Sequence, residues 1–181
     1  EKLNELQKLI EVEHKADKII IFTQYSDTAR YIYNQLRKRG IQASDYATGD
    51  SDNPTAIVER FSPISNGNSS LSPKEQTRIL IATDVLSEGQ NLQDAGFLVN
   101  YDLHWNPVRM IQRNGRINRL GSTYENILIA NVKPHDDLEF YLNLIRRLEH
   151  KIATINFTVG NDQSILGESE NPIEFHEILE S

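Results

Sequence analysis

Five short apolar runs alternate with amphipathic stretches along most of the chain. The runs cover residues 18–23, 41–47, 78–83, 97–101 and 126–132. A continuous apolar run between turn residues is typical of a strand that is buried on both faces, as parallel sheets require. Because helical patterns separate the runs, the sequence predicts an α/β fold: a parallel sheet with right-handed crossovers and helices on both faces. In such a sheet, ligands bind beyond the carboxyl ends of the strands.

The first helical patterns begin at residues suited to that position. An apolar face at the N-terminus predicts a lead-in helix within residues 1–16, and because the chain starts inside it, we expect a piece of a longer protein. Ser26 or Asp27 can cap the next helix, and Asn53 can cap a short helix over residues 54–61.

A long amphipathic pattern and an acidic tail follow the last apolar run. Residues 136–158 predict a helix, and a linker comes after it. The Asn-Pro pair at 171–172 predicts one more short acidic helix through Leu179. We therefore expect one domain over residues 1–158 and a tail over residues 159–181.

Charge is distributed unevenly along the 181 residues, whose formal net charge is −7. No Lys or Arg follows Lys151, whereas six acidic side chains do, so residues 1–151 are close to neutral. Strong binding to nucleic acid by this chain alone is therefore not expected, although a local phosphate-binding face is compatible with this balance.

Other features of the composition argue against several kinds of site. The chain has no cysteine, hence neither disulfides nor thiolate metal sites, which fits a cytoplasmic protein. Its five histidines share no ligand spacing, so we expect no bound zinc. No apolar run approaches the length of a membrane span, and we expect no membrane partner.

Residues 106–122 (NPVRMIQRNGRINRLGS) contain a dense cluster of basic side chains. Four arginines fall within eleven residues: Arg109, Arg113, Arg116 and Arg119. Pro107 can open a helix, and we expect Val108 and Ile111 to form its buried side. The Asn-Gly pair at 114–115 predicts that the helix ends soon afterwards.

Three side chains of this segment are predicted to share one side of the helix. Gln112, Arg116 and Arg119 are spaced by four and three residues. Guanidinium binds phosphate through a planar and permanently charged fork, so this ridge suits the charge of a transferring phosphoryl group. The alternative interpretation is a solvated basic helix face.

Residues 83–93 (TDVLSEGQNLQ) directly follow the third apolar run. Glycine permits close approach of a ligand, and hydroxyls and amides supply neutral hydrogen bonds, so the segment suits contact with phosphates or a ribose. The alternative interpretation is an ordinary turn between strand and helix, which also requires Asp, Ser and Gly.

In this order and spacing, the sequence resembles the second RecA-like domain of superfamily 2 helicases, and within them the SWI/SNF-type, RapA-like translocases. ILIATDVLSEGQNLQDA is similar to motif V, and QRNGRINRLG matches the motif VI pattern Q-R-x-G-R-x-x-R without a gap. IIIFTQYSDTA is similar to motif IV, YATGD to a glycine turn on the nucleic-acid backbone, and DLHWNP to the segment between motifs V and VI. The resemblance covers roughly residues 18–135 and implies a RecA-like sheet of the P-loop NTPase type.

The resemblance also implies roles for individual residues at the nucleotide. Arg116 and Arg119 match the arginines that such domains present to the γ-phosphate of ATP, with Gln112 beside them as a sensor. Gly89 and Asn91 fall where motif V lines the sugar and phosphates of the nucleotide.

A second group of residues matches positions that contact nucleic acid in the family. The group follows three of the expected strands and consists of Gln24, Tyr25, Thr48, Gly49, Thr83 and Ser87. The first four match contacts to the backbone of the tracked strand, and the last two match positions that couple motif V to that strand.

Two parts of an ATPase site are missing from the sequence. It contains no G-x-x-x-x-G-K-[ST] loop for phosphates and no strand that ends in an Asp-Glu pair for Mg²⁺. In the family these parts belong to the N-terminal RecA-like domain of the same protein, which would hold most of ATP and Mg²⁺. We therefore expect this chain to be inactive alone and to act as the C-terminal motor lobe of a double-stranded DNA translocase or helicase. Two alternatives remain open: an RNA helicase lobe, and a non-catalytic module that binds a phosphorylated or acidic partner.

Overall fold

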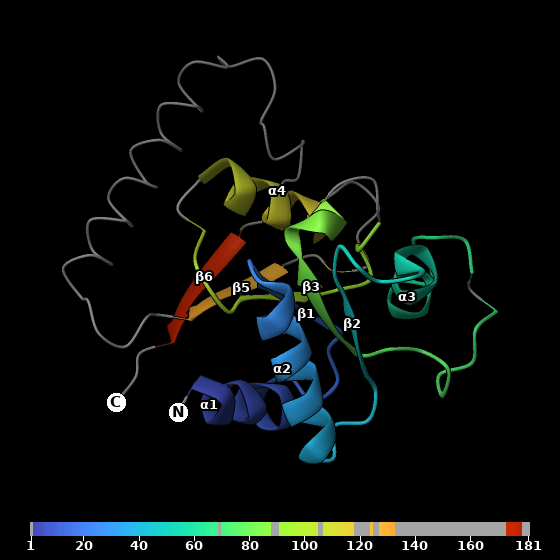
Figure 1. Ribbon diagram of the computed structural model, residues 1–181, viewed down its shortest axis with the longest axis horizontal. Coiled ribbons are helices and arrows are strands. Elements are labelled where there is room, and N and C mark those ends of the chain that lie inside the picture. The colour runs from blue at the N-terminus through green and yellow to red at the C-terminus, as the bar shows by residue number, and fades with distance from the viewer. Residues whose placement is uncertain are drawn as a thin grey trace.

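A computed structural model describes residues 2–68, 70–87, 91–104, 107–117, 124, 127–132 and 173–178. Six strands of these residues form one sheet in the order β2-β3-β1-β4-β5-β6, and every neighbouring pair is parallel (Figure 1). The strands are β1 (Ile19–Thr23), β2 (Ser44–Ala47), β3 (Ile79–Thr83), β4 (Phe97–Asn100), β5 (Ile127–Val132) and β6 (Ile173–Ile178). The five strands predicted from apolar runs are therefore confirmed.

Helices cover both faces of the sheet, as predicted. The described helices are α1 (Lys2–Lys8), η1 (Leu9–Glu13), α2 (Ser26–Lys38), α3 (Pro54–Phe61), η2 (Asp84–Ser87) and α4 (Pro107–Ile117). One core cluster joins α1, η1 and α2 to one face of the strands, and a second joins α3, η2 and α4 to the other. Figure 1 shows α2 in front of the central strands, with α4 above and α3 to the right in this view. Within the described part of the chain, no helix has the length and apolar character needed to span a bilayer.

The central strands have no solvent-facing side, which explains their continuous apolar sequence. Ile19 and Ile21 of β1 pack with α2, whereas Ile20 and Phe22 pack on the opposite face. All five residues of β1 and of β3 are buried. Since full burial of one such apolar side chain contributes about 1.5–3 kcal/mol, these two strands supply much of the driving force for folding.

Local sequence signals have mixed outcomes at the helix starts. The Asn53 side chain accepts a hydrogen bond from the Ala56 amide at 3.0 Å, which confirms the predicted cap of α3. The predicted cap of α2 is wrong, because Tyr25 occupies the N-cap position and Ser26 is already helical. The carbonyl of Tyr25 accepts the first helical bond, from the Ala29 amide at 3.0 Å.

The C-terminal segment differs from the prediction. A short helix was expected after the Asn-Pro pair, but Ile173–Ile178 form strand β6, which pairs in parallel with β5. The sequence IEFHEI combines β-branched and aromatic residues that favour strands, and β5 would otherwise be the edge of the sheet. The helix predicted over residues 136–158 and the linker after it lie outside the described residues, so the domain division after residue 158 stays a prediction.

Candidate functional site

The carboxyl ends of the parallel strands bring the candidate loops to one edge of the sheet. In the strand register Thr23 pairs with Thr83, and Phe22 pairs with Asn100. The segments that follow β1, β3 and β4 therefore leave the sheet side by side, and α4 contacts η2, the segment that follows β3. This edge is where ligands of open α/β sheets bind.

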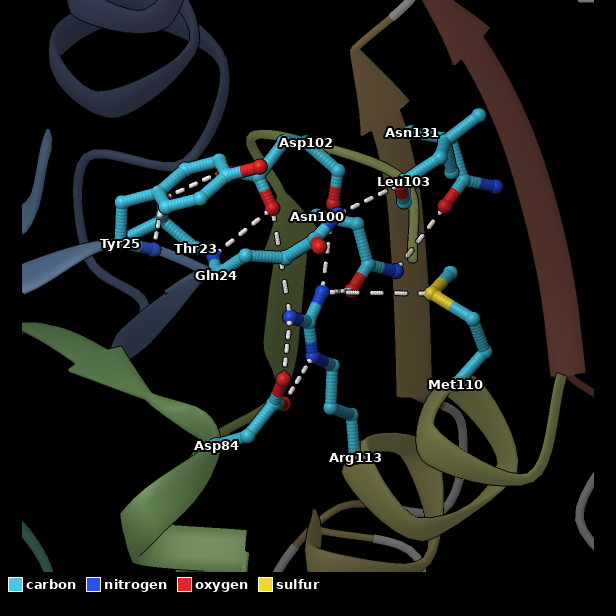
Figure 2. Close-up of polar contacts among 10 residues, drawn as sticks. All are labelled: Thr23, Gln24, Tyr25, Asp84, Asn100, Asp102, Leu103, Met110, Arg113 and Asn131. Carbon is cyan, nitrogen blue, oxygen red and sulfur yellow. Dashed lines mark hydrogen bonds and ion pairs between the residues drawn. The ribbon is translucent and has the colours of Figure 1, made fainter. Parts of the chain in front are cut away.

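A buried arginine, Arg113 of α4, lies at the centre of this edge. Its side chain is fully buried, with a relative exposure of 0%. It donates two hydrogen bonds to the carboxylate of Asp84, from Nε to Oδ1 at 2.6 Å and from Nη2 to Oδ2 at 3.0 Å (Figure 2). Asp84 is the first residue of η2, directly after β3. The pair therefore attaches α4 to the end of the third strand.

The remaining donors of Arg113 reach the end of β4. Its Nη1 donates to the side-chain oxygen of Asn100 and to the main-chain oxygen of Asp102, both at 3.2 Å. The Asp102 carboxylate lies 4.0 Å from Nη2, and the guanidinium carbon is 5.4 Å from the ring centroid of Phe22. Burial of a charge is costly unless charge and hydrogen bonds are both compensated, and here two carboxylates and an aromatic face compensate it.

Asp102 also binds the end of β1. Its carboxylate accepts hydrogen bonds from the Thr23 hydroxyl and from the main-chain amide of Gln24, the latter at 2.8 Å. The Gln24 side chain in turn donates to the main-chain oxygen of Leu103 at 2.8 Å. Figure 2 shows these residues above the guanidinium group, opposite Asp84. One polar network thus connects β1, β3, β4 and α4.

The buried side of α4 differs from the one expected. Met110, Arg113 and Ile117 are buried, whereas Val108 is 44% exposed and Ile111 is only partly buried. The spacing 110, 113, 117 defines one helical ridge, but its central position is an arginine, which a pattern of apolar residues does not count. The expectation that Val108 and Ile111 form the buried side was therefore wrong.

Comparison with known proteins identifies the family. A family model described as helicase conserved C-terminal domain matches residues 1–121. The chain belongs to this family. In its sequence, this helicase C-terminal domain is similar to the uncharacterized ATP-dependent helicase YqhH of Bacillus subtilis (strain 168), with 32% identity over 150 residues. The match covers 83% of the chain but only 24% of the relative, so the chain spans about a quarter of that protein.

Solved structures share the fold of this chain. The C-terminal part of the Fun30 ATPase domain gives a TM-score of 0.64 at 20% identity, covering 81% of this chain and 44% of that one. The C-terminal domain of the DEAD-box protein Dbp5 gives a TM-score of 0.59 at 23% identity, covering 86% of this chain and 80% of that one. The Hef helicase domain of Pyrococcus furiosus gives a TM-score of 0.54 at 27% identity, covering 78% of this chain and 28% of that one. The RecA-like fold expected from the sequence is thereby confirmed.

In this helicase C-terminal domain, the predicted anion-binding ridge of Gln112, Arg116 and Arg119 is described only in part. Gln112 is exposed and Arg116 is partly buried near the end of α4. Arg119 and Gly89 lie outside the described residues. The described helix includes the Asn-Gly pair and runs to Ile117, close to the end that the sequence predicts after this pair. Because the buried Arg113 fixes the rotation of α4, Gln112 is held on its outward side.

Asn91 has a structural task that the sequence did not indicate. Its side-chain nitrogen donates to the main-chain oxygen of Ser65 at 3.2 Å, and its own main-chain oxygen accepts from Asn66 at 2.9 Å. Nearby, the buried Asp94 accepts bonds from the amides of Ile64 and Ser65 at 2.8 and 3.0 Å. The end of motif V therefore holds the start of the Ser- and Asn-rich loop, and the nucleotide role of Asn91 stays a prediction.

Hydroxyl and backbone groups at the ends of β1, β2 and β3 form a row across the sheet. Thr23 pairs with Thr83, and because Ala47 pairs with Ala82, Thr48 continues the same row. The Thr48 hydroxyl donates to Asp50 at 2.6 Å, whereas the buried Thr83 hydroxyl has no hydrogen-bond partner among the described residues.

The other predicted nucleic-acid positions flank this row. Tyr25 is 63% exposed at the start of α2, and Gly49 is exposed in the turn after β2. Gln24 is partly buried through its bond to Leu103, and Ser87 ends η2. The structure therefore gathers the six residues at one edge of the sheet, while their contacts to nucleic acid stay predictions.

The described donor set fits a phosphate better than a metal ion. Asp84 and Asp102 are the carboxylates closest to the centre of the edge, and both face Arg113. Among the described residues, no group of three His, Asp or Glu side chains could hold a metal. Gln112 and Arg116 supply an amide and a guanidinium, which are suited to an anion.

Proposed function

We propose that this helicase C-terminal domain is the second motor lobe of an ATP-dependent DNA translocase or helicase. The observation that carries the proposal is the burial of Arg113, which locks α4 to the ends of β3 and β4 with Gln112 on its outward side. This arrangement suits a rigid helix that faces a nucleotide held by another domain. The description of YqhH as an ATP-dependent helicase supports the same conclusion.

Each residue of the predicted anion-binding ridge, Gln112, Arg116 and Arg119, has a proposed task at the nucleotide. ATP, held with Mg²⁺ mainly by the N-terminal RecA-like domain, supplies the phosphoryl group that is transferred to water. Arg116 and Arg119 place positive charge where negative charge accumulates during that transfer, and Gln112 donates or accepts a neutral hydrogen bond beside them. Gly89 and Asn91 form the wall next to the sugar and phosphates. Because the chain lacks a phosphate-binding loop, it has no ATP turnover of its own under this proposal.

The nucleic-acid track of the proposal runs past the ends of β2 and β3, where Thr48, Gly49 and Thr83 lie, to Gln24 and Tyr25 after β1. The exposed Gly49 backbone is a neutral group suited to a phosphate, and exposed Tyr25 can contact a sugar or base. The buried Thr48 and Thr83 are proposed to act through the backbone segments that they hold at this edge. Since the chain carries a net charge of −7, these groups position DNA within the whole protein but do not bind it strongly alone. The similarity of DLHWNP to RapA-like translocases favours double-stranded DNA.

A comparison of nucleic acids tests the proposal on the intact protein. Its ATP turnover is measured without nucleic acid, with duplex DNA, and with single-stranded and duplex RNA, all at one salt concentration because phosphate contacts depend on salt. Stimulation by duplex DNA above that by RNA is the expected result. Stimulation by RNA alone would favour the RNA helicase alternative, and no turnover under any condition would contradict the motor assignment.

A further inference from the structure

A chain of hydrogen bonds connects the helix with Gln112 and Arg116 to the strand end with Gln24. It starts at Nη1 of Arg113, which donates to the main-chain oxygen of Asp102 at 3.2 Å. It continues through the Asp102 carboxylate, which accepts from the Thr23 hydroxyl and from the Gln24 amide. Asp102 therefore contacts the helix that carries one proposed working surface, through Arg113, and a residue of the other surface, Gln24, although it belongs to neither.

We propose that Asp102 is a positioning residue that couples the nucleotide-facing helix α4 to the nucleic-acid track at the end of β1. The inference rests on the proposed function and adds the path by which the two sites influence each other. Asp102 itself touches neither the nucleotide nor the nucleic acid. It acts through Arg113 on one side and through Thr23 and Gln24 on the other.

The geometry of Asp102 suits a coupling element because one residue serves both sides. Its Oδ1 lies 2.8 Å from the Gln24 nitrogen and 4.0 Å from Nη2 of Arg113. Its side chain is 26% exposed, so its charge is partly shielded from water and its interaction with the guanidinium is stronger than at the surface. A displacement of Arg113 therefore changes the electrostatic field at the atom that holds Gln24.

Because Arg113 is bonded to several elements, these elements would move together with it. The two bonds to Asp84 join α4 to η2, so any movement of the guanidinium involves the helix and the end of β3 together. On the other side, the Thr23 hydroxyl also lies 3.4 Å from the Tyr25 amide. Thr23 and Asp102 therefore fix the backbone that presents Gln24 and Tyr25 to nucleic acid.

Two substitutions in the intact protein interrupt this path at different atoms. Asp102→Asn keeps the main-chain oxygen that Arg113 binds but removes the negative charge between Arg113 and Gln24. Thr23→Val has nearly the same shape but lacks the hydroxyl that donates to Asp102. A branch of the same network provides the matched control: Asn131→Ala removes the partner of Asn100, at 2.9 Å, on the side that leads away from β1.

The readout is the ratio of ATP turnover with saturating duplex DNA to turnover without DNA. We expect Asp102→Asn and Thr23→Val each to lower this ratio by about three- to thirtyfold while basal turnover stays within about twofold of wild type. The double variant should be no worse than the stronger single variant, because both interrupt one path. Asn131→Ala should retain the wild-type ratio.

Each contrary outcome has a defined meaning. An unchanged ratio in both variants overturns the inference, as does an equal fall of basal and stimulated turnover, which indicates a structural role alone. If Asp102→Asn does not fold, Thr23→Val decides between these outcomes. Arg116→Ala is measured in parallel. Near-normal ATP turnover in Arg116→Ala would contradict the proposed function itself. If Arg116→Ala loses turnover but Asp102→Asn keeps the wild-type ratio, only the coupling role of Asp102 is contradicted.

Discussion

Arg113 and Asp84 form a bidentate ion pair, with Nε to Oδ1 at 2.6 Å and Nη2 to Oδ2 at 3.0 Å, in which the arginine is fully buried. Paired hydrogen bonds between charged groups fix orientation as well as distance. Because Asp84 directly follows β3, the pair determines how α4 is rotated against the sheet. The outward position of Gln112, and with it the proposed ATP contact, depends on this pair.

Removal of Arg113 should therefore destabilise the domain strongly. Arg113→Ala removes the bonds that the guanidinium donates to the Asp84 carboxylate and the Asn100 side chain, which should lower the free energy of unfolding by about 3–5 kcal/mol. Arg109→Ala removes the same charge from a partly exposed position of the same helix and should change the free energy of unfolding by about 0.5 kcal/mol or less. Urea unfolding of both variants checks this. Equal effects would show that burial of Arg113 does not hold α4.

The sequence predicted the parallel sheet well because each central strand carries its own signal. IIIFT and ILIAT are buried at every position, and their short length, their β-branched residues and the turn residues around them favour strands over helices. The Asn53 cap was found for the same reason, since the side chain bonds three residues away. Such local signals need no knowledge of the rest of the fold.

Apart from the cap of α2, which lies one residue earlier than predicted, the errors concern residues whose partners are distant in the sequence. Arg113 finds Asp84, which is 29 residues away, and so a charged side chain occupies the buried ridge of α4. Asp102 carries no local signal, because its partners, Thr23 and Gln24, lie nearly eighty residues earlier. Ile173–Ile178 are a strand because β5 offers them an edge. The spacing of Met110 and Ile117 around Arg113 was the one signal that could have revealed the buried arginine.

Two glycines should respond in opposite ways to the same substitution. A Cβ atom at Gly96 would lie 2.5 Å from the Tyr124 ring, so Gly96→Ala should destabilise the domain by about 1–3 kcal/mol. A Cβ atom at Gly115, inside α4, meets no described atom within 4 Å, so Gly115→Ala should stabilise it by about 0.5–1 kcal/mol. Thermal unfolding of the two variants measures both signs. A fall in melting temperature for Gly115→Ala would contradict the helical geometry described for α4.

His104 should make the domain sensitive to mild acid. Partial burial lowers its pKa below the ordinary value of 6.5; Asp84 and Asp102 oppose this, and Arg113 and Arg109 reinforce it. The unfolded chain therefore takes up a proton before the folded one. The contribution of His104 to the pH dependence is absent well above pH 6.5, and stability falls as the pH drops below 6.5 until the folded pKa is passed.

A neutral replacement tests this assignment. The free energy of unfolding is compared at about pH 7.5 and about pH 5.5 for wild type and His104→Gln. Wild type should lose more stability over this interval than the variant. If both lose the same amount, His104 does not titrate with a lowered pKa.

The central claim is that this domain supplies positive charge to a nucleotide held by another domain. Its most direct test is ATP turnover by the intact protein with Arg116→Ala and, separately, Arg119→Ala, alongside nucleotide binding. Lys38→Ala at the exposed end of α2 is the control for loss of one positive charge. We predict that both arginine variants bind nucleotide but turn over ATP roughly 10³-fold more slowly, whereas the control is normal. Near-normal turnover in both arginine variants would contradict the account.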